Sequence, residues 1–151
     1  MFFKDGSLYS YKMSNSIDRV LNIGWLSIDQ VFSTGEFPQE FMDKLTQIIC
    51  GNAKFDAHFN LIRGIRSCDF CNKTEVILKC GAGEMPLGMS EILIPHGREK
   101  GYFFAAPSLV VHYILEHGYI PPSEFIESVL AVNLTGNFNA DEVFDNILDA
   151  S

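Results

Sequence analysis

Two pairs of side chains that bind transition metals stand far apart in this chain. Cys68 and Cys71 form a C-x-x-C motif, and His112 and His117 follow later with four residues between them. Two thiolates and two imidazoles are a common ligand set for a tetrahedral structural Zn²⁺ ion, and a C-x-x-C turn presents both sulfur atoms to one metal. The pattern therefore predicts a single zinc site built from these four residues.

The same residues also have a simpler interpretation, and the sequence leaves both open. Positions five apart on a regular helix point about 140° apart, so the two histidines converge only if their helix ends near Glu116, as Gly118 suggests. Otherwise Cys68 and Cys71 are reduced thiols in a turn, and the histidines cap and pack the helix end. A redox role is less expected, because this C-x-x-C motif does not open a helix after a strand.

The other two cysteines, Cys50 and Cys80, are expected to be small buried residues rather than a disulfide. The chain begins without a basic leader followed by a long apolar segment, and no uninterrupted apolar run is long enough to cross a membrane. These features predict a cytoplasmic protein with no membrane span, in which thiols stay reduced.

The elements that must position the metal-binding pairs are strands in the middle of the chain and helices toward both ends. Short extended runs predict strands, and apolar residues at helical spacing behind Ser, Asn or Pro predict helices. The predicted strands cover residues 7–13, 59–65, 75–80, 91–95 and 101–105. The predicted helices lie at residues 17–21, 38–49, 109–117, 122–130 and 139–148.

This order of elements predicts an α+β fold, with a small antiparallel sheet in the middle of the chain flanked by N- and C-terminal helices. The chain has 151 residues, 47% of them hydrophobic and thirteen of them Phe. That is the size of one domain, with enough apolar side chains to build a core without disulfides. We therefore expect a single domain over residues 1–151, in which residues 133–151 form an acidic helical extension.

Negative charge is concentrated near the C-terminal end. The net charge is −8, yet residues 1–100 carry eleven basic and twelve acidic side chains, whereas residues 101–151 carry seven acids and neither Lys nor Arg. Such a one-sided field steers and orients a basic partner. Aromatic side chains on this part of the chain are expected to anchor the partner if they are exposed, and to belong to the core if they are not. The predicted partner-binding residues are Glu124, Glu127, Asp141, Glu142, Asp145, Asp149, Phe138 and Phe144.

An acidic chain is not expected to bind nucleic acid or anionic membranes directly, because both are bound chiefly through Lys and Arg. A modest cluster of basic residues surrounds the C-x-x-C turn: Lys54, Arg63, Arg66 and Lys73. Asp56 and Asp69 offset this cluster, which is therefore interpreted as a solvated face rather than a nucleic-acid contact.

Catalytic patterns are weak in this sequence. Ser108 and His112 stand four residues apart on one predicted helix face, a spacing that is common by chance. Neither a nucleophile elbow, a phosphate-binding loop nor an H-E-x-x-H motif occurs. The sequence does not predict an enzyme.

The segment that carries the histidines also resembles a known group of proteins. Residues 102–125 contain the pattern A-P-x-L-x-x-H-Y-x-x-x-H-x-Y-x-P-P-x-E-F, preceded by Gly24-Trp25-Leu26 and by G-E-F-P-Q-E-F at residues 35–41. Together with the C-x-x-C motif, this is similar to the signature of a family of small bacterial proteins over most of residues 23–130. The tail of residues 133–151 lies outside that likeness and resembles the acidic extensions of immunity proteins from contact-dependent and other interbacterial toxin systems.

The resemblance and the charge pattern together favour a binding protein. The leading hypothesis is an immunity protein, a monomer or small homo-oligomer, that binds a cognate bacterial toxin and occludes its active site. The toxin is expected to be a basic nuclease, whose charge complements the acidic segment. The alternative is a zinc-stabilised regulatory or nucleic-acid-associated binding module centred on the C-x-x-C turn.

Overall fold

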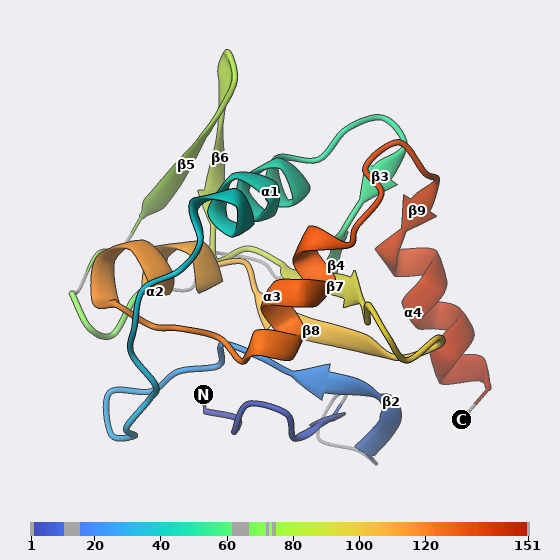
Figure 1. Ribbon diagram of the computed structural model, residues 1–151, viewed down its shortest axis with the longest axis horizontal. Helices are drawn as coiled ribbons and strands as arrows, with labels where there is room; N and C mark the ends of the chain where they lie inside the picture. The colour runs from blue at the N-terminus through green and yellow to red at the C-terminus, as the bar shows by residue number, and fades with distance from the viewer. Residues whose placement is uncertain (1, 11–15, 62–66, 72, 74, 151) are drawn as a thin grey trace.

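The computed structural model of the chain describes residues 2–10, 16–61, 67–71, 73 and 75–150. Within them, helices and strands form an α+β architecture, which confirms the predicted fold class (Figure 1). The helices are α1 (Gln39–Cys50), α2 (Val110–His117), α3 (Ser123–Leu130) and α4 (Ala140–Asp149). The strands are β1 (Leu8–Ser10), β2 (Ser16–Asn22), β3 (Phe55–Asp56), β4 (His58–Phe59), β5 (Val76–Cys80), β6 (Gly83–Leu87), β7 (Glu91–Pro95), β8 (Phe103–Pro107) and β9 (Phe138–Asn139).

Five of these strands form the central sheet, in the order β1-β2-β8-β7-β4. Neighbouring strands run antiparallel except β2 and β8, which run parallel with Val20 opposite Phe103 and Asn22 opposite Ala105. The sheet is larger than the middle of the chain alone predicts, because the N-terminal strands β1 and β2 extend it along one side. Parallel strands need a long connection, and the chain between β2 and β8 contains α1 and the β5–β6 hairpin.

The helix predicted at residues 17–21 is wrong, since this segment is strand β2. Ile17 and Val20 are buried, and β2 pairs with β1 on one side and with β8 on the other. β-branched side chains pack well on a pleated surface, and pairing on both edges outweighs the local helix signal. Of the strand predicted at residues 59–65, β4 contains Phe59, whereas residues 62–66 lie outside the described part of the chain.

The central sheet has a hydrophobic layer on each face. Along β8, Phe104 and Ala106 join the larger core with α1, α2 and α3, whereas Ala105 between them joins a smaller core with α4. The same alternation along β7 sends Ile92 to the larger core and Leu93 to the smaller one, as the period of two along a strand requires. Three helices therefore cover one face, and α4 covers the other.

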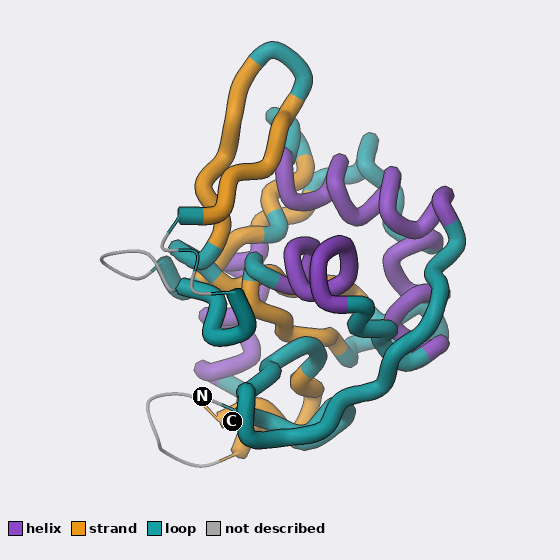
Figure 2. Tube along the Cα trace, turned by 90° about the vertical axis from the view of Figure 1, so that its left-hand side faces the viewer, coloured by secondary structure: helices purple, strands orange, loops and turns teal. Residues whose placement is uncertain are grey.

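The β5–β6 hairpin projects away from the rest of the molecule (Figures 1 and 2). Cys80 at the end of β5 forms a disulfide with Cys50 at the end of α1, where the two Cα atoms lie 5.5 Å apart. The expectation that these two cysteines are reduced is therefore wrong, because the fold brings the ends of α1 and β5 together. Among the described residues, no helix is both long and apolar enough to cross a lipid bilayer.

Candidate metal centre

The two histidines belong to α2, a short apolar helix that packs into the larger core. Gly118 ends the helix with a φ of +72°, and its N–H donates to the carbonyl of Tyr113. Glycine adopts this left-handed conformation without steric cost, which explains why the helix stops here. His117 is thus the last helical residue, and its Nε2 lies 3.3 Å from Nε2 of His112. The spacing of five residues does not keep the two rings apart.

The C-x-x-C turn is held against α2 by the aromatic residue inside the motif. The ring of Phe70 meets Tyr113 edge-on with centroids 5.9 Å apart, and it lies 5.3 Å from the ring of His117. On its other side Phe70 meets Phe32 at 5.4 Å. The N–H of Cys68 donates to the carbonyl of Lys73 at 3.3 Å, which closes the turn. The role of Phe70 was not predicted from the sequence, although its position between the two cysteines was an available signal.

The four predicted ligands come together in the fold. Sγ of Cys68 lies 3.4 Å from Nε2 of His117, and Sγ of Cys71 lies 3.4 Å from Nε2 of His112. All four donor atoms lie within 4.8 Å of one another. Ordinary zinc bond lengths in a regular tetrahedron separate two nitrogens by about 3.3 Å and a nitrogen from a sulfur by about 3.6 Å. The three donor distances given above are close to these values, and two sulfurs with two imidazole nitrogens are a ligand set that suits zinc.

Burial shifts the pKa of two side chains of this cluster, Cys68 and His112. It raises the pKa of the Cys68 thiol, against hydrogen bonds from the backbone of Phe70 and Cys71 that lower it. Burial also lowers the pKa of His112, and the neighbouring His117 lowers it further. Without metal, the cluster thus holds a neutral thiol at Cys68 and a neutral imidazole at His112. A metal ion bound here would be held by the thiolate, and its binding would displace a proton from Cys68.

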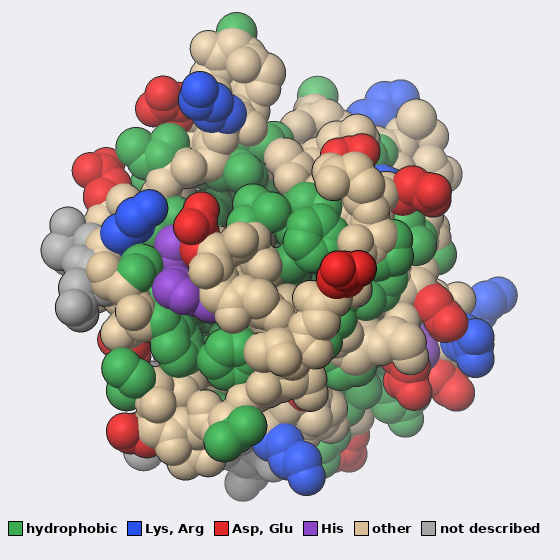
Figure 3. All heavy atoms as spheres, turned by 60° about the vertical axis from the view of Figure 1, so that its left-hand side comes forward, with side chains coloured by type: hydrophobic (Ala, Val, Ile, Leu, Met, Phe, Trp, Pro, Cys, Tyr) green, Lys and Arg blue, Asp and Glu red, His purple; other side chains and the backbone are tan. Residues whose placement is uncertain are grey.

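The cluster lies at the edge of the molecule. Cys68 and His112 are buried, His117 is half-buried and Cys71 is exposed. Figure 3 brings the side of the molecule that carries α2 forward, and histidine atoms reach the surface there. The four side chains thus connect the core to the surface.

Comparison with known families assigns the chain to one of them. Residues 1–130 match the model of the family described as Domain of unknown function (DUF7919). The chain belongs to the DUF7919 family. No curated protein and no solved structure matches it. All four residues of the candidate metal centre lie inside the DUF7919 match, whereas α4 lies beyond it.

The predicted partner-binding acids fall into two groups. Glu124 lies 3.7 Å from Nε2 of His96, and Glu127 lies 3.0 Å from the guanidinium of Arg98, so both acids face basic groups of the same chain. The other four are exposed on α4 and form no ion pair among the described residues: Asp141, Glu142, Asp145 and Asp149. These four are called the α4 acids below.

The two predicted aromatic anchors differ in burial. Phe144 is 4% exposed in the core under α4, so the interpretation as an exposed anchor is wrong for this residue. Phe138 is half-buried, and its ring stacks on Phe55 with centroids 4.8 Å apart. Phe144 is buried because it lies on the apolar face of the amphipathic helix α4, and that face packs on the sheet.

The remaining candidates have structural contacts. The hydroxyl of Ser108 accepts a hydrogen bond from the N–H of Gly88 at 2.8 Å, and the imidazole of His112 faces Cys71 and His117. Of the basic cluster around the C-x-x-C turn, Lys54 and Lys73 are exposed, whereas Arg63 and Arg66 lie outside the described residues.

Proposed function

We propose that this protein is a zinc-stabilised binding module, in which the metal joins the C-x-x-C turn to α2. The observation that carries the proposal is the convergence of Cys68, Cys71, His112 and His117 at spacings that fit one zinc ion. Four protein ligands complete a tetrahedron and leave no open position for water or substrate, which is typical of structural sites rather than catalytic ones. Zinc would therefore contribute to folding free energy.

Metal analysis of the purified protein tests this proposal. We expect about one zinc per chain after desalting, and we expect Cys68→Ser to lose most of it. The matched control is Cys50→Ser combined with Cys80→Ser, which removes two sulfurs outside the cluster and should leave the zinc content unchanged. A wild-type protein without zinc, or a Cys68→Ser variant that keeps it, would contradict the proposal.

A second proposal concerns the partner of the module. We propose that the outward surface of α4 binds a basic protein, and that the protein acts as an immunity protein against a cognate nuclease toxin. Support comes from the four α4 acids, which are exposed, and from the absence of Lys and Arg after residue 100. The mechanism would be steric and electrostatic occlusion of the nuclease groove, with the acids steering association.

The test is binding of a purified toxin encoded beside this gene, measured at low and high salt. Added salt screens exposed charges, so the affinity should fall as the salt concentration rises. Asp141→Lys with Asp145→Lys should weaken binding, whereas Glu84→Lys, an exposed acid in the distant β6, should change it little. Binding that is indifferent to both salt and charge reversal on α4 would refute this version.

A further inference from the structure

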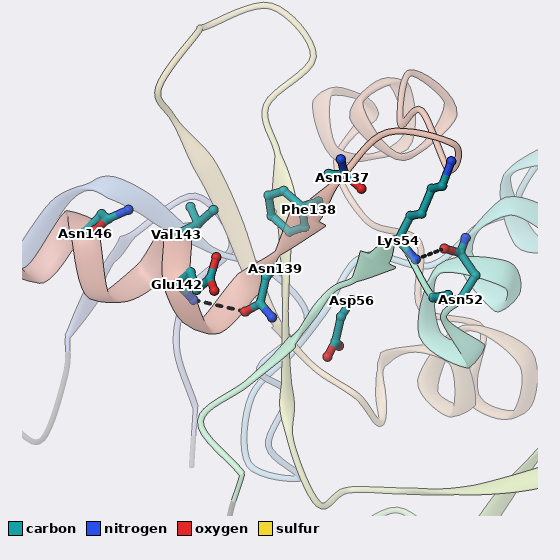
Figure 4. A pocket seen from close by; sticks show the side chains of 10 residues that line it. Asn52, Lys54, Asp56, Asn137, Phe138, Asn139, Glu142, Val143 and Asn146 are labelled. Atoms are coloured by element: carbon teal, nitrogen blue, oxygen red, sulfur yellow. Dashed lines mark hydrogen bonds between the residues drawn. The ribbon is translucent and has the colours of Figure 1, made fainter.

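A hollow of about 470 Å³ lies between β3, β9 and the first turns of α4 (Figure 4). Its base is fixed by the core, because β3 and β9 pair in parallel and Phe138 stacks on the buried ring of Phe55. The N–H of Phe138 also donates to the carbonyl of Lys54 at 2.8 Å. Polar side chains dominate the lining, which consists of Asn52, Ala53, Lys54, Asp56, Asn137, Phe138, Asn139, Glu142, Val143 and Asn146.

Some of the lining side chains hold the walls in place. The carboxamide of Asn52 accepts hydrogen bonds from the N–H groups of Lys54 and Phe55 and donates to the carbonyl of Leu134. Asn139 caps α4, since its Oδ1 accepts from the N–H of Glu142 at 3.1 Å. These bonds define the shape of the hollow before any ligand arrives.

Other lining groups have hydrogen-bonding capacity to spare. Within the described part of the chain, the carboxamides of Asn137 and Asn146 and the carboxylate of Glu142 form no hydrogen bond or ion pair (Figure 4). Asp56 accepts the N–H of His58 with Oδ1 alone, which leaves Oδ2 for a further donor. A carboxamide offers both a donor and an acceptor, the same pair that a peptide unit offers.

The charged side chains of the lining are two acids and one base, so the hollow has a net negative charge. Asp56 and Glu142 contribute carboxylates to the lining, and in Figure 4 the side chain of Lys54 extends away from both of them. Asp141 and Asp145 stand exposed on the same helix. A cationic group in the hollow would therefore find carboxylate and carboxamide oxygens in its lining.

We infer that this hollow binds the guanidinium group of an arginine carried on an extended segment of a protein partner. The planar fork of arginine matches carboxylate and carboxamide acceptors in pairs, and the carboxamides of Asn137 and Asn146 suit the peptide units on either side of it. The inference rests on the proposed partner-binding function of α4, and it adds the place and the chemistry of contact.

The probe is a blocked tripeptide, acetyl-Gly-Arg-Gly-amide, titrated into isotopically labelled full-length protein and followed by NMR. We expect saturable shifts in the side-chain amide signals of Asn137 and Asn146 and in the backbone signal of Glu142. Dissociation constants on the order of 1 mM are typical of such a small contact, and the matched Gln tripeptide should bind about tenfold more weakly. Equal shifts with both peptides, or shifts spread over acids outside the hollow, would overturn the inference.

Two variants that each remove one negative charge distinguish binding in the hollow from a general attraction of the peptide to the acidic helix α4. Glu142→Gln should weaken binding of the arginine peptide about tenfold, whereas Asp149→Asn, on the same helix but outside the lining, should change it less than about twofold. Unchanged spectra of both free variants would show that each is folded. Equal losses in the two variants would overturn the inference.

Failure of this inference can be distinguished from failure of the proposed partner binding. If the peptide does not bind in the hollow while a basic toxin still binds with salt dependence, the inference fails and the partner proposal stands. If the peptide binds there while no basic protein does, the hollow is supported and the immunity proposal fails.

Discussion

Gly24 adopts a φ of +74° directly beside α2, and a Cβ atom at this position would lie 2.8 Å from Cγ2 of Val110. Its N–H donates to Oδ1 of Asp5 at 2.9 Å, and the indole N–H of the next residue, Trp25, donates to the carbonyl of Ala105 at 3.1 Å. The Gly-Trp pair therefore joins the end of β2 to both the N-terminal segment and β8. Glycine is needed here for two reasons, backbone conformation and close packing.

Gly24→Ala is expected to lower the free energy of unfolding by about 2–4 kcal/mol, because the strain of positive φ adds to overpacking against Val110. Gly6→Ala is the matched control, since Gly6 has a φ of +84° and nothing lies within 4 Å of its added Cβ. It should cost about 1 kcal/mol, the strain alone. Urea denaturation of both variants measures the difference. Equal losses would show that the contact with α2 relaxes without cost.

Tyr119 is fully buried, and its hydroxyl donates to Oδ2 of Asp5 at 2.8 Å. Burial raises the pKa of Tyr119, and the negative charge of Asp5 raises it further. The folded state thus keeps this phenol protonated at pH values where the unfolded chain releases the proton. A raised folded-state pKa contributes stability below the unfolded value of about 10, and this contribution is lost as the pH rises above it.

Tyr119→Phe should therefore lower the free energy of unfolding by about 1 kcal/mol near neutral pH, the net value of one hydrogen bond. Above a pH of about 10 the advantage of the wild type should shrink by about 1.4 kcal/mol per pH unit, because only the wild-type phenol ionises on unfolding. Denaturant titrations of both proteins at several pH values test this. A difference that stays constant up to pH 11 would contradict the assigned pKa direction.

Among the elements, the segment from the C-x-x-C turn to the end of β5 is fixed at both ends. Cys68 and Cys71 lie against His117 and His112 of α2, and the disulfide joins Cys80 to Cys50 of α1. Both connections attach the β5–β6 hairpin region to helices of the larger core. The two connections use different cysteines, so their effects on stability can be separated.

Removing the disulfide with Cys50→Ala and Cys80→Ala should lower the free energy of unfolding by about 3 kcal/mol. The disulfide closes a loop between two cysteines that are 30 residues apart, and without it the unfolded chain gains conformational entropy. The zinc content should not change. Conversely, Cys68→Ser should lose zinc while the disulfide persists. Denaturation in non-reducing buffer, metal analysis and thiol titration give the three readouts, and loss of zinc in the disulfide variant would show that the two connections are coupled.

The sequence predicted the elements whose signals are local. Gly118 correctly placed the end of α2, and residue types together with spacing selected the four side chains that the fold brings together. Strand β2 was missed because its conformation depends on pairing with β1 and β8, and β8 lies about eighty residues away in the chain.

Long-range contacts also explain the other omissions. The Cys50–Cys80 disulfide depends on how α1 packs beside β5, which no local pattern reports. The hollow beside α4 depends on the pairing of two short strands that lie far apart in the sequence, β3 and β9. In contrast, the amphipathic pattern of α4 allowed either interpretation of Phe144, because a pattern shows which side chains share a face and not what covers that face.

At the scale of the whole molecule, α4 has two surfaces, one buried and apolar and the other exposed and acidic. Its inward side chains Ala140 and Phe144 complete the smaller core, where Phe144 lies 4.8 Å from the ring of Phe59 and 5.6 Å from that of Tyr9. Its outward side carries the α4 acids. The family match ends at residue 130, yet the sheet face beneath α4 is apolar and needs this helix to cover it.

Phe144→Ala should therefore lower the free energy of unfolding by about 3–5 kcal/mol, the usual cost of emptying a buried aromatic site. Asp145→Asn with Asp149→Asn should change stability by less than about 0.5 kcal/mol, because both acids are exposed. Urea denaturation compares the two variants, and binding of a hydrophobic dye should rise for Phe144→Ala alone. If neutralising the acids destabilised the protein as much as emptying the core, the outward surface of α4 would be structural, and its charge would need no partner to explain it.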